Sequence, residues 1–204
     1  MNKLNVFNKM VRRVHVGTIH QLYGMSNGTG SFAYRNNVIA LTGNAKQNDK
    51  EFLAHYIHHK YHHKHVRLDD PVKEVAKILF DFHDAKIDGL KNMVDVRWSI
   101  TPQQTMNFIR KEFLDNKIQD MLPYVDKNFL AHLMYFRIMN NPTHNYVISD
   151  LQTYNEYKVL SRLHPVVIRV KDLLHTSDEH NILYHHTITT ESTESMIRQF
   201  DHIF

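Results

Sequence analysis

Apolar residues recur at helical spacing along most of this chain, and this pattern predicts a mostly helical protein. In the first expected helix, Phe7, Met10, Val11 and Val14 share one face. The expected helices span residues 5–23, 48–65, 71–92, 101–121 and 126–139, with one more capped by Ser149 and Gln152 and a short amphipathic one at the C-terminus.

Only one region has a clear strand pattern. Residues 32–41 read as one or two short strands, whereas the later stretch HPVVIRVKDLL fits a helix or a strand equally well. With no linker-like stretch in view, residues 1–204 are expected to form a single domain whose part from 101 to 204 is helical. The expected fold class is mostly α with a small β element near residues 32–41.

Composition narrows the function classes. The chain has no cysteine, which excludes disulfide scaffolds and thiolate-ligated metal sites and fits a cytoplasmic protein. No apolar run is long enough to cross a membrane. The formal net charge of +4 does not compel nucleic-acid binding, and any protein partner is left open. The unusual feature is the content of 17 histidines, which points to imidazole chemistry.

Six histidines gather in the expected helix 48–65, where they cover roughly 160° of its circumference. They are His55, His58, His59, His62, His63 and His65. His55 and His59 are four residues apart, which is the spacing at which one helix offers two imidazoles to a single metal ion. A solvent-exposed polar face explains the same pattern without any metal.

A third ligand is expected on the helix 71–92. His83 falls near the middle of that helix's apolar arc, and Asp84 lies at its margin. A buried histidine needs a polar partner, and successive helices usually pack together. His55 and His59 with His83 or Asp84 would therefore form a three-ligand site with an open position, as in catalytic zinc centres.

The chain resembles the zincin-like, metallopeptidase-like domain found with von Willebrand A domains in cobalt-chelatase-subunit-like proteins of bacteria and large phages. The resemblance rests on VIAL (38–41), LAHYIHH (53–59) and HDAKID (83–88). It implies a zincin-like single domain with a divalent metal, zinc first, in the cytoplasm (of the host, if a phage encodes the chain). Tyr56 replaces the general-base glutamate of that family, which implies lost or altered peptidase activity.

A second resemblance is to HD-domain phosphohydrolases, such as small alarmone hydrolases and 5′-nucleotidases. Their ligands would correspond here to His55 or His59, then His83 and Asp84, then Asp150. This resemblance implies metal-dependent hydrolysis of nucleotides, with manganese as the metal. Asp150 also suits the start of a capped helix without any metal, so its removal is expected to cost little stability. A third possibility is a non-catalytic structural or interaction protein with a histidine-rich surface helix.

Overall fold

The computed structural model describes residues 38–173 and 182–204. The chain divides into two compact units, residues 1–35 and 36–204, and all described residues belong to the second. The helix expected over 5–23 and the first part of the strand region 32–41 lie outside the described residues.

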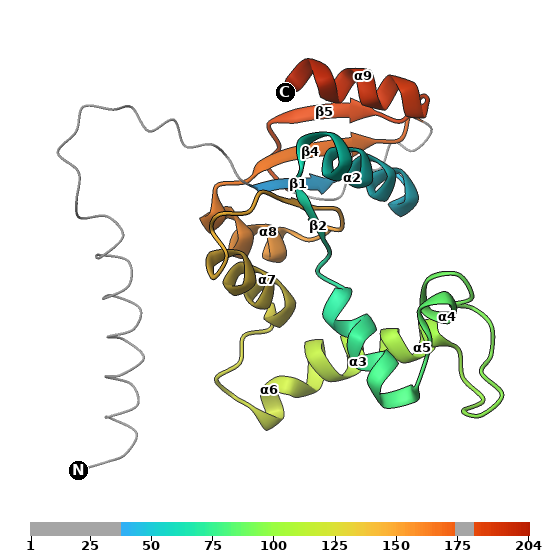
Figure 1. Ribbon diagram of the computed structural model, residues 1–204. Helices are drawn as coiled ribbons and strands as arrows, with labels where there is room; N and C mark the ends of the chain where they lie inside the picture. The colour runs from blue at the N-terminus through green and yellow to red at the C-terminus, as the bar shows by residue number, and fades with distance from the viewer. Residues whose placement is uncertain (1–37, 174–181) are drawn as a thin grey trace, which may run out of the picture. The chain divides into compact units, whose positions relative to one another are not determined.

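A five-stranded parallel sheet forms the centre of this unit (Figure 1). Its strands are β1 (Val38–Thr42), β2 (Lys64–Val66), β3 (Tyr146–Ile148), β4 (Val166–Lys171) and β5 (His186–Thr189), in the order β2-β3-β1-β4-β5. All four pairings are parallel. The expectation of a mostly α, zincin-like domain with one small β element is therefore wrong, and the fold is α/β.

The hydrophobic pattern of the sequence did not predict these strands, because both faces of the sheet are covered. All five residues of β1 are buried, so its sequence is a continuous apolar run without the alternation of a half-exposed strand. β2 and β3 are only three residues long, and too short to show any period. The stretch HPVVIRVKDLL, which fits a helix or a strand equally well by its sequence, forms the strand β4 in the structure.

Helices pack on both faces of the sheet (Figure 1). On one face α2 (Gln47–Tyr61) and α9 (Thr193–Ile203) cover the side chains of Ile39 and Leu41. On the other face α7 (Phe129–Met139) and α8 (Tyr154–Leu160), followed by the short η2 (Ser161–Leu163), pack over Val38 and Ala40. Successive residues of β1 thus alternate between two apolar cores.

A third core lies outside the sheet, in a segment that we call the helical segment, residues 70–121. It contains α3 (Asp70–Phe80), α4 (Asp84–Asp88), α5 (Pro102–Asn107), the π-helical η1 (Phe108–Lys117) and α6 (Ile118–Met121). Apolar side chains from α3, α4, α5 and η1, including Val72, Ile87 and Met106, pack together there. Leu130 at the start of α7 joins this cluster, so the third core is distinct from the two on the sheet but is shared between the helical segment and α7.

Two of the expected helices are interrupted in the structure. The helix expected over 48–65 ends at Tyr61 because His62 adopts a left-handed conformation (φ 58°), and the chain then enters β2. The helix expected over 71–92 breaks at Asp81 (φ 54°) and resumes as α4. Both breaks use left-handed residues other than glycine, which local composition does not signal.

The helix start expected at Ser149 is also wrong, since this residue directly follows β3, and α8 begins after Thr153. Other expectations are confirmed. Thr101 and Gln104 form the capping box at the start of α5, and helices occupy most of 126–139 and the C-terminus. Among the described residues, no helix combines the length and apolarity needed to cross a membrane.

Candidate functional site

The order of the strands creates a crevice at one edge of the sheet. β1 and β3 are neighbours, but the helices that follow them, α2 and α8, lie on opposite faces. The chain therefore leaves the carboxyl ends of these two strands in opposite directions, and ligands of open α/β sheets bind at this kind of position.

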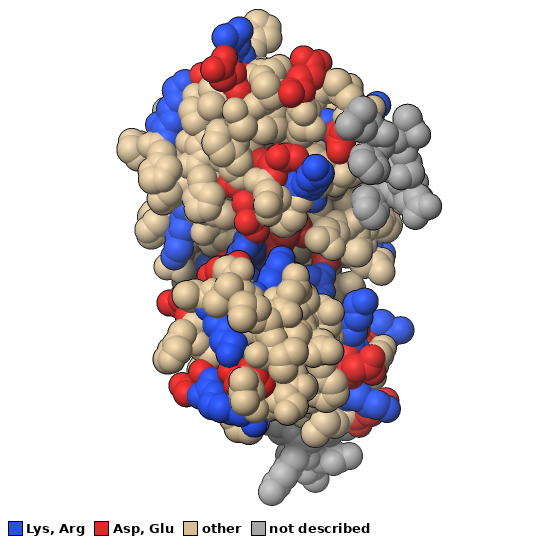
Figure 2. Space-filling view, turned by 90° about the vertical axis from the view of Figure 1, so that its right-hand side faces the viewer, with Lys and Arg blue, Asp and Glu red and all other residues tan. Residues whose placement is uncertain are grey.

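A cavity of about 710 Å³ lies at this edge. Its lining comes from the segments that follow β1, β2 and β3 and from the facing surface of the helical segment, including Gln47, Glu51, Arg67, Asp150, Lys73, Lys91, Gln103 and Arg110. Figure 2 faces this side of the molecule and shows acidic and basic side chains mixed in a band across its middle. The cavity lies within the size range of small-molecule sites, about 300–1,000 Å³.

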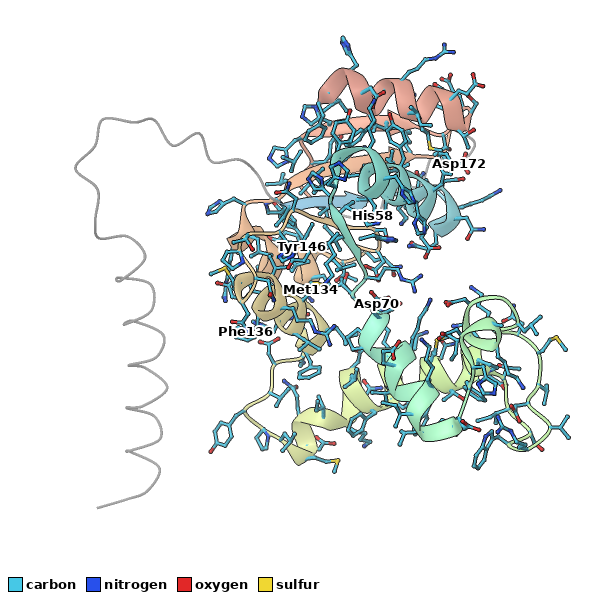
Figure 3. All side chains as sticks on the ribbon, viewed as in Figure 1. His58, Asp70, Met134, Phe136, Tyr146 and Asp172 are labelled. Carbon is cyan, nitrogen blue, oxygen red and sulfur yellow. The ribbon has the colours of Figure 1, made fainter. Side chains whose placement is uncertain are left out.

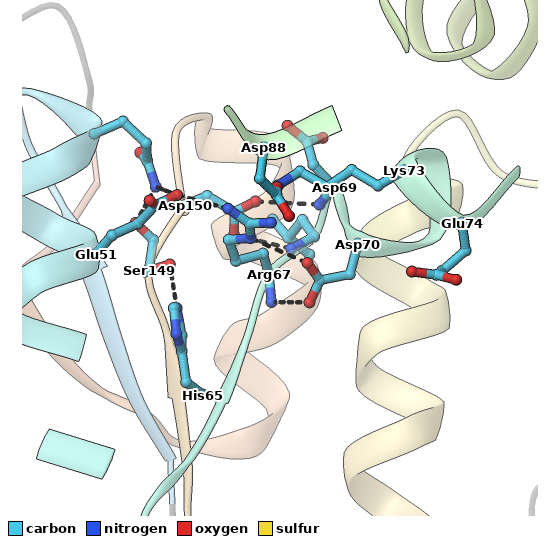
Figure 4. Close-up of polar contacts among 12 residues, drawn as sticks. Glu51, His65, Arg67, Asp69, Asp70, Lys73, Glu74, Asp88, Ser149 and Asp150 are labelled. Atoms are coloured by element: carbon cyan, nitrogen blue, oxygen red, sulfur yellow. Dashed lines mark hydrogen bonds and ion pairs between the residues drawn. The ribbon is translucent and has the colours of Figure 1, made fainter. Parts of the chain in front are cut away.

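Asp150 lies at the floor of the crevice, next to Ser149, the residue that follows β3 (Figure 4). Its side chain is only 4% exposed, and its two oxygens accept hydrogen bonds from the backbone N–H groups of Leu68 (2.9 Å) and Asp69 (3.1 Å). Burial raises the pKa of Asp150 to about 7, and the nearby negative charges of Asp69 and Glu156 act in the same direction. The Asp150 carboxyl group therefore changes charge near neutral pH.

Two arginines cross the crevice. Arg67 donates to Glu51 on α2 (2.7 Å) and to Asp70 at the start of α3 (3.0 Å). Arg110, from η1, donates to Asp69 and also to Glu156 of α8 (2.9 Å). These contacts connect the helical segment to the helices of the sheet, and they hold two guanidinium groups in fixed positions beside the cavity.

The helical segment contributes a cationic and partly apolar wall. Lys73 forms an ion pair with Asp88 (2.5 Å), whereas Lys91 pairs with no carboxylate among the described residues. Apolar and amide side chains lie beside these lysines: Val72, Ile87, Met106, Gln103 and Asn107. Val72 and Ile87 are only 2% and 1% exposed, so the surface open to a ligand here comes mainly from the polar side chains.

The connection from β1 to α2 has the strand–loop–helix order of a phosphate-binding loop. It departs from the Gly-x₄-Gly-Lys-Ser/Thr pattern, because Asn48, Asp49 and Lys50 stand at the last three positions counted from Gly43. Lys50 is 4% exposed, and its ammonium group donates to the Gly43 carbonyl (3.3 Å). Burial lowers the pKa of Lys50, and the charge of Asp150 opposes this effect.

One histidine pair lines the crevice on the α2 side. The rings of His55 and His65 meet edge to face with their centroids 4.9 Å apart, and His65 Nε2 lies 2.7 Å from the Ser149 hydroxyl. Burial, together with the neighbouring His55 and Arg67, lowers the pKa of His65 to about 4. His65 is thus held in its neutral form at physiological pH.

The residues predicted as metal ligands do not come together in one place. His55 and Asp150 both line the crevice. His59 lies against His58 instead (ring centroids 5.0 Å apart), and His83 occupies the position before α4. The Asp84 side chain is 81% exposed and pairs with Lys77 (2.6 Å).

No group of three or more potential ligands is arranged to hold a metal ion within residues 38–173 and 182–204. Zinc or manganese binding therefore stays a prediction. Tyr56, expected in place of a general base, donates a hydrogen bond to Asp201 (2.7 Å) and so connects α2 to α9.

Sequence reasoning missed most of the crevice residues, among them Arg67, Lys73, Lys91 and Arg110. Two local signals were present. The strand sequence VIALT is followed by Gly43 ahead of a helix, and the apolar run YVI is followed directly by Ser149 and Asp150. Each is typical of a buried parallel strand that delivers polar residues to the carboxyl edge of a sheet. A comparison with protein-family models and with curated protein sequences found no match to this chain.

Proposed function

We propose that this protein binds a phosphorylated nucleoside in the crevice at the carboxyl edge of its sheet. The observation that carries the proposal is the cavity between β1 and β3, lined by Arg67, Lys73, Lys91 and Arg110. Guanidinium and ammonium groups are the side chains that best bind phosphate oxygens, and a parallel α/β sheet offers them at this edge.

The carboxylates of the crevice support the same ligand class. Asp69, Asp88 and Asp150 lie among the cations, so a bare anion would meet mixed charge. Mg²⁺ is commonly held by one or two carboxylates together with the phosphates of a substrate. In a magnesium-bound phosphorylated ligand, the metal ion would therefore face the carboxylates of the crevice and the phosphate would face its cations.

The helical segment supports a nucleoside as the organic part of the ligand. The amides of Gln103 and Asn107 line the cavity there and can donate and accept hydrogen bonds at the edge of a base. Because the β1–α2 connection lacks the Lys-Ser/Thr pair, the proposal concerns binding and not phosphoryl transfer.

Thermal denaturation with added nucleotides tests the proposal. A ligand that binds the folded state stabilises it by RT ln(1 + [L]/Kd), about 2.7 kcal/mol at a hundredfold excess over Kd. We expect nucleoside mono- or triphosphates with Mg²⁺ to raise the melting temperature more than inorganic phosphate does.

Lys91→Met should weaken nucleotide binding by about tenfold, as expected for one charge-assisted hydrogen bond. Lys111→Met is the matched control, since Lys111 is exposed on η1 and does not line the cavity. Equal nucleotide affinities of Lys91→Met and Lys111→Met would count against the proposal. So would a melting temperature of the wild type that no nucleotide changes.

A metal-dependent hydrolase is a second proposal, supported by the presence of His55 and Asp150 in the same crevice. Metal content of protein purified without an affinity tag tests it. Stoichiometric metal that is lost in His55→Ala and kept in His83→Ala would support a metal centre in the crevice. Protein that retains no metal in either form would argue against it.

A further inference from the structure

The connection between α4 and α5, residues 89–100, exposes many apolar side chains. Five of its twelve residues are large, apolar and exposed: Leu90, Met93, Val94, Val96 and Trp98. Val96 is the extreme case, with 93% of its surface exposed. Connections between helices are normally polar, because apolar surface in contact with water costs free energy. Figure 3 shows side chains of this connection pointing outward from the helical segment, and so away from its core.

Hydrogen bonds around Asp95 fix the conformation of this connection. The Asp95 carboxylate is buried and accepts hydrogen bonds from the backbone N–H of Arg97 (2.9 Å) and from Lys86 of α4 (2.6 Å). The backbone N–H of Asp95 donates to the carbonyl of Ile100 (2.8 Å), and the N–H of Ser99 donates to the carbonyl of Asp95 (2.7 Å). A surface that is ordered before it meets a partner loses less conformational entropy on binding.

Further contacts join the connection to the end of α3. The Trp98 indole N–H donates to the carbonyl of Phe80 (2.9 Å), and the two rings meet edge to face with their centroids 5.7 Å apart. The Arg97 guanidinium donates to the carboxylate of Asp81 (2.9 Å), directly after the helix. α3 begins at Asp70, which lines the crevice (Figure 3 labels Asp70). The exposed connection therefore lies at the opposite end of α3 from the crevice.

α3 adds a second set of exposed apolar side chains. Val72 and Ala76 are buried in the core of the helical segment, and the neighbouring arc of the helix carries three more apolar residues: Val75, Ile78 and Leu79. All three are exposed, Ile78 by 79%. The apolar arc of α3 is therefore wider than the surface that its neighbours in the segment cover.

The two sets make a surface that we call the apolar patch. It consists of Val75, Ile78, Leu79, Leu90, Met93, Val94, Val96 and Trp98. The sets meet at the last turn of α3, where Trp98 packs on Phe80. The eight residues together expose on the order of 900 Å², and one partner of a stable interface of standard size buries about 800 Å². The area of the patch is thus sufficient for a specific protein interface.

The charges around the apolar patch indicate the kind of partner. Acidic and basic side chains border it in equal numbers: Glu74, Asp81, Asp84 and Asp88 against Lys77, Lys86, Lys91 and Arg97. In Figure 2 the lower half of the face is mostly uncharged at its centre and has both signs at its margin. An anionic membrane or a nucleic acid would need an excess of cations. A second copy of this chain has the same mixed border, and two-fold symmetry allows the acids of one copy to face the bases of the other.

We propose that the apolar patch is the interface through which two copies of this chain form a symmetric dimer. The interface is independent of the function proposed for the crevice, because none of the eight described residues of the patch lines that cavity.

Sedimentation velocity of the full chain tests the proposal over a concentration series from about 1 to 100 μM, where interfaces of standard size with modest affinity assemble. At the upper end we expect particles with twice the mass of one chain. Hydrogen exchange measured by mass spectrometry locates the interface. As the concentration rises, exchange should slow in residues 89–100 and stay unchanged in β5.

The double variant Ile78→Gln/Val96→Gln should weaken the association at least tenfold, because each substitution removes apolar contacts twice in a two-fold interface. Its melting temperature, measured on dilute monomeric protein, should equal that of the wild type, since both side chains are exposed. The control is Met121→Gln/Leu183→Gln, which removes two exposed apolar side chains outside the patch. The control should assemble like the wild type.

Three results would overturn the proposal. The wild type could stay monomeric at every concentration of the series. The patch variant and the control could assemble equally well, which would place the interface elsewhere. Finally, vesicles containing anionic lipid could bind the monomeric wild type and not the patch variant, which would assign the patch to a membrane surface.

Discussion

Asp150 is the residue whose environment the structure changes most from expectation. Its burial and its two backbone hydrogen bonds replace the exposed helix start that the sequence suggested. Its pKa rises from 3.8 to about 7 in the folded state, so the folded protein binds this proton more tightly than the unfolded chain does. The resulting stabilisation, about 4 kcal/mol at most, is complete below about pH 4 and is lost as the pH rises to about 7.

Asp150→Asn should therefore flatten the pH dependence of the free energy of unfolding, measured by urea denaturation between pH 5 and 8. At about pH 5 the Asp150 carboxyl group is protonated and, like the asparagine amide, has one full acceptor oxygen, so the two proteins should differ by less than about 1 kcal/mol, and the variant should lose less stability as the pH rises toward 8. Asp120→Asn, at an exposed position, is the control and should keep the wild-type slope. The same slope in Asp150→Asn and in the wild type would refute the buried, proton-binding role.

Gly43 is required by its backbone conformation. Its φ of +104° disfavours residues with a side chain, and an added Cβ would clash with the Val170 carbonyl oxygen on β4. We expect Gly43→Ala to destabilise the protein by about 2–4 kcal/mol and to weaken nucleotide binding, because the β1–α2 connection must move. Chemical denaturation and the nucleotide titration measure the two effects. Wild-type stability in the variant would contradict the steric argument.

At the scale of secondary structure, one carboxylate joins the C-terminal helix α9 to α2. Asp201 accepts hydrogen bonds from Tyr56 (2.7 Å), Tyr61 (2.9 Å) and Lys60 (2.6 Å), all of them on α2. Asp201→Asn should speed amide hydrogen exchange in α9 while exchange in β1 stays unchanged. Because Lys60 and the tyrosines lower the pKa of Asp201, this contribution is present above about pH 4 and lost as the pH falls further. Uniform protection of α9 in both proteins would show that apolar packing alone holds the helix.

At the scale of the whole unit, polar contacts join the helical segment to the sheet. Arg110 contacts Asp69 and Glu156, and Glu156 is buried. Arg110→Ala should lower the free energy of unfolding by about 2–3 kcal/mol, because it leaves a buried carboxylate without its cation. Arg198→Ala removes the exposed contact with Glu194 and should cost less than about 0.5 kcal/mol. Similar losses in the two variants would mean that Arg110 does not connect the segments.

The sequence by itself determined local features of this protein. The capping box of Thr101 and Gln104, most of the helix expected over 126–139 and the amphipathic C-terminal helix all depend on residues close together in the chain, and the structure confirms them. The absence of cysteine and the abundance of histidine are likewise properties of the sequence alone. The i,i+4 spacing of His55 and His59 was also read correctly, because both lie on the single helix α2.

Only the tertiary structure decided the sheet, the crevice and the place of the histidines. β2 and β3 are three residues long and are stabilised by partners far away in the chain, such as the pairing of Lys64 with Tyr146. No local period records such a pairing, because its hydrogen bonds and its burial come from residues about 80 positions apart. The same long-range pairing brings Asp150 beside Leu68 and Asp69, and it places His65 against Ser149.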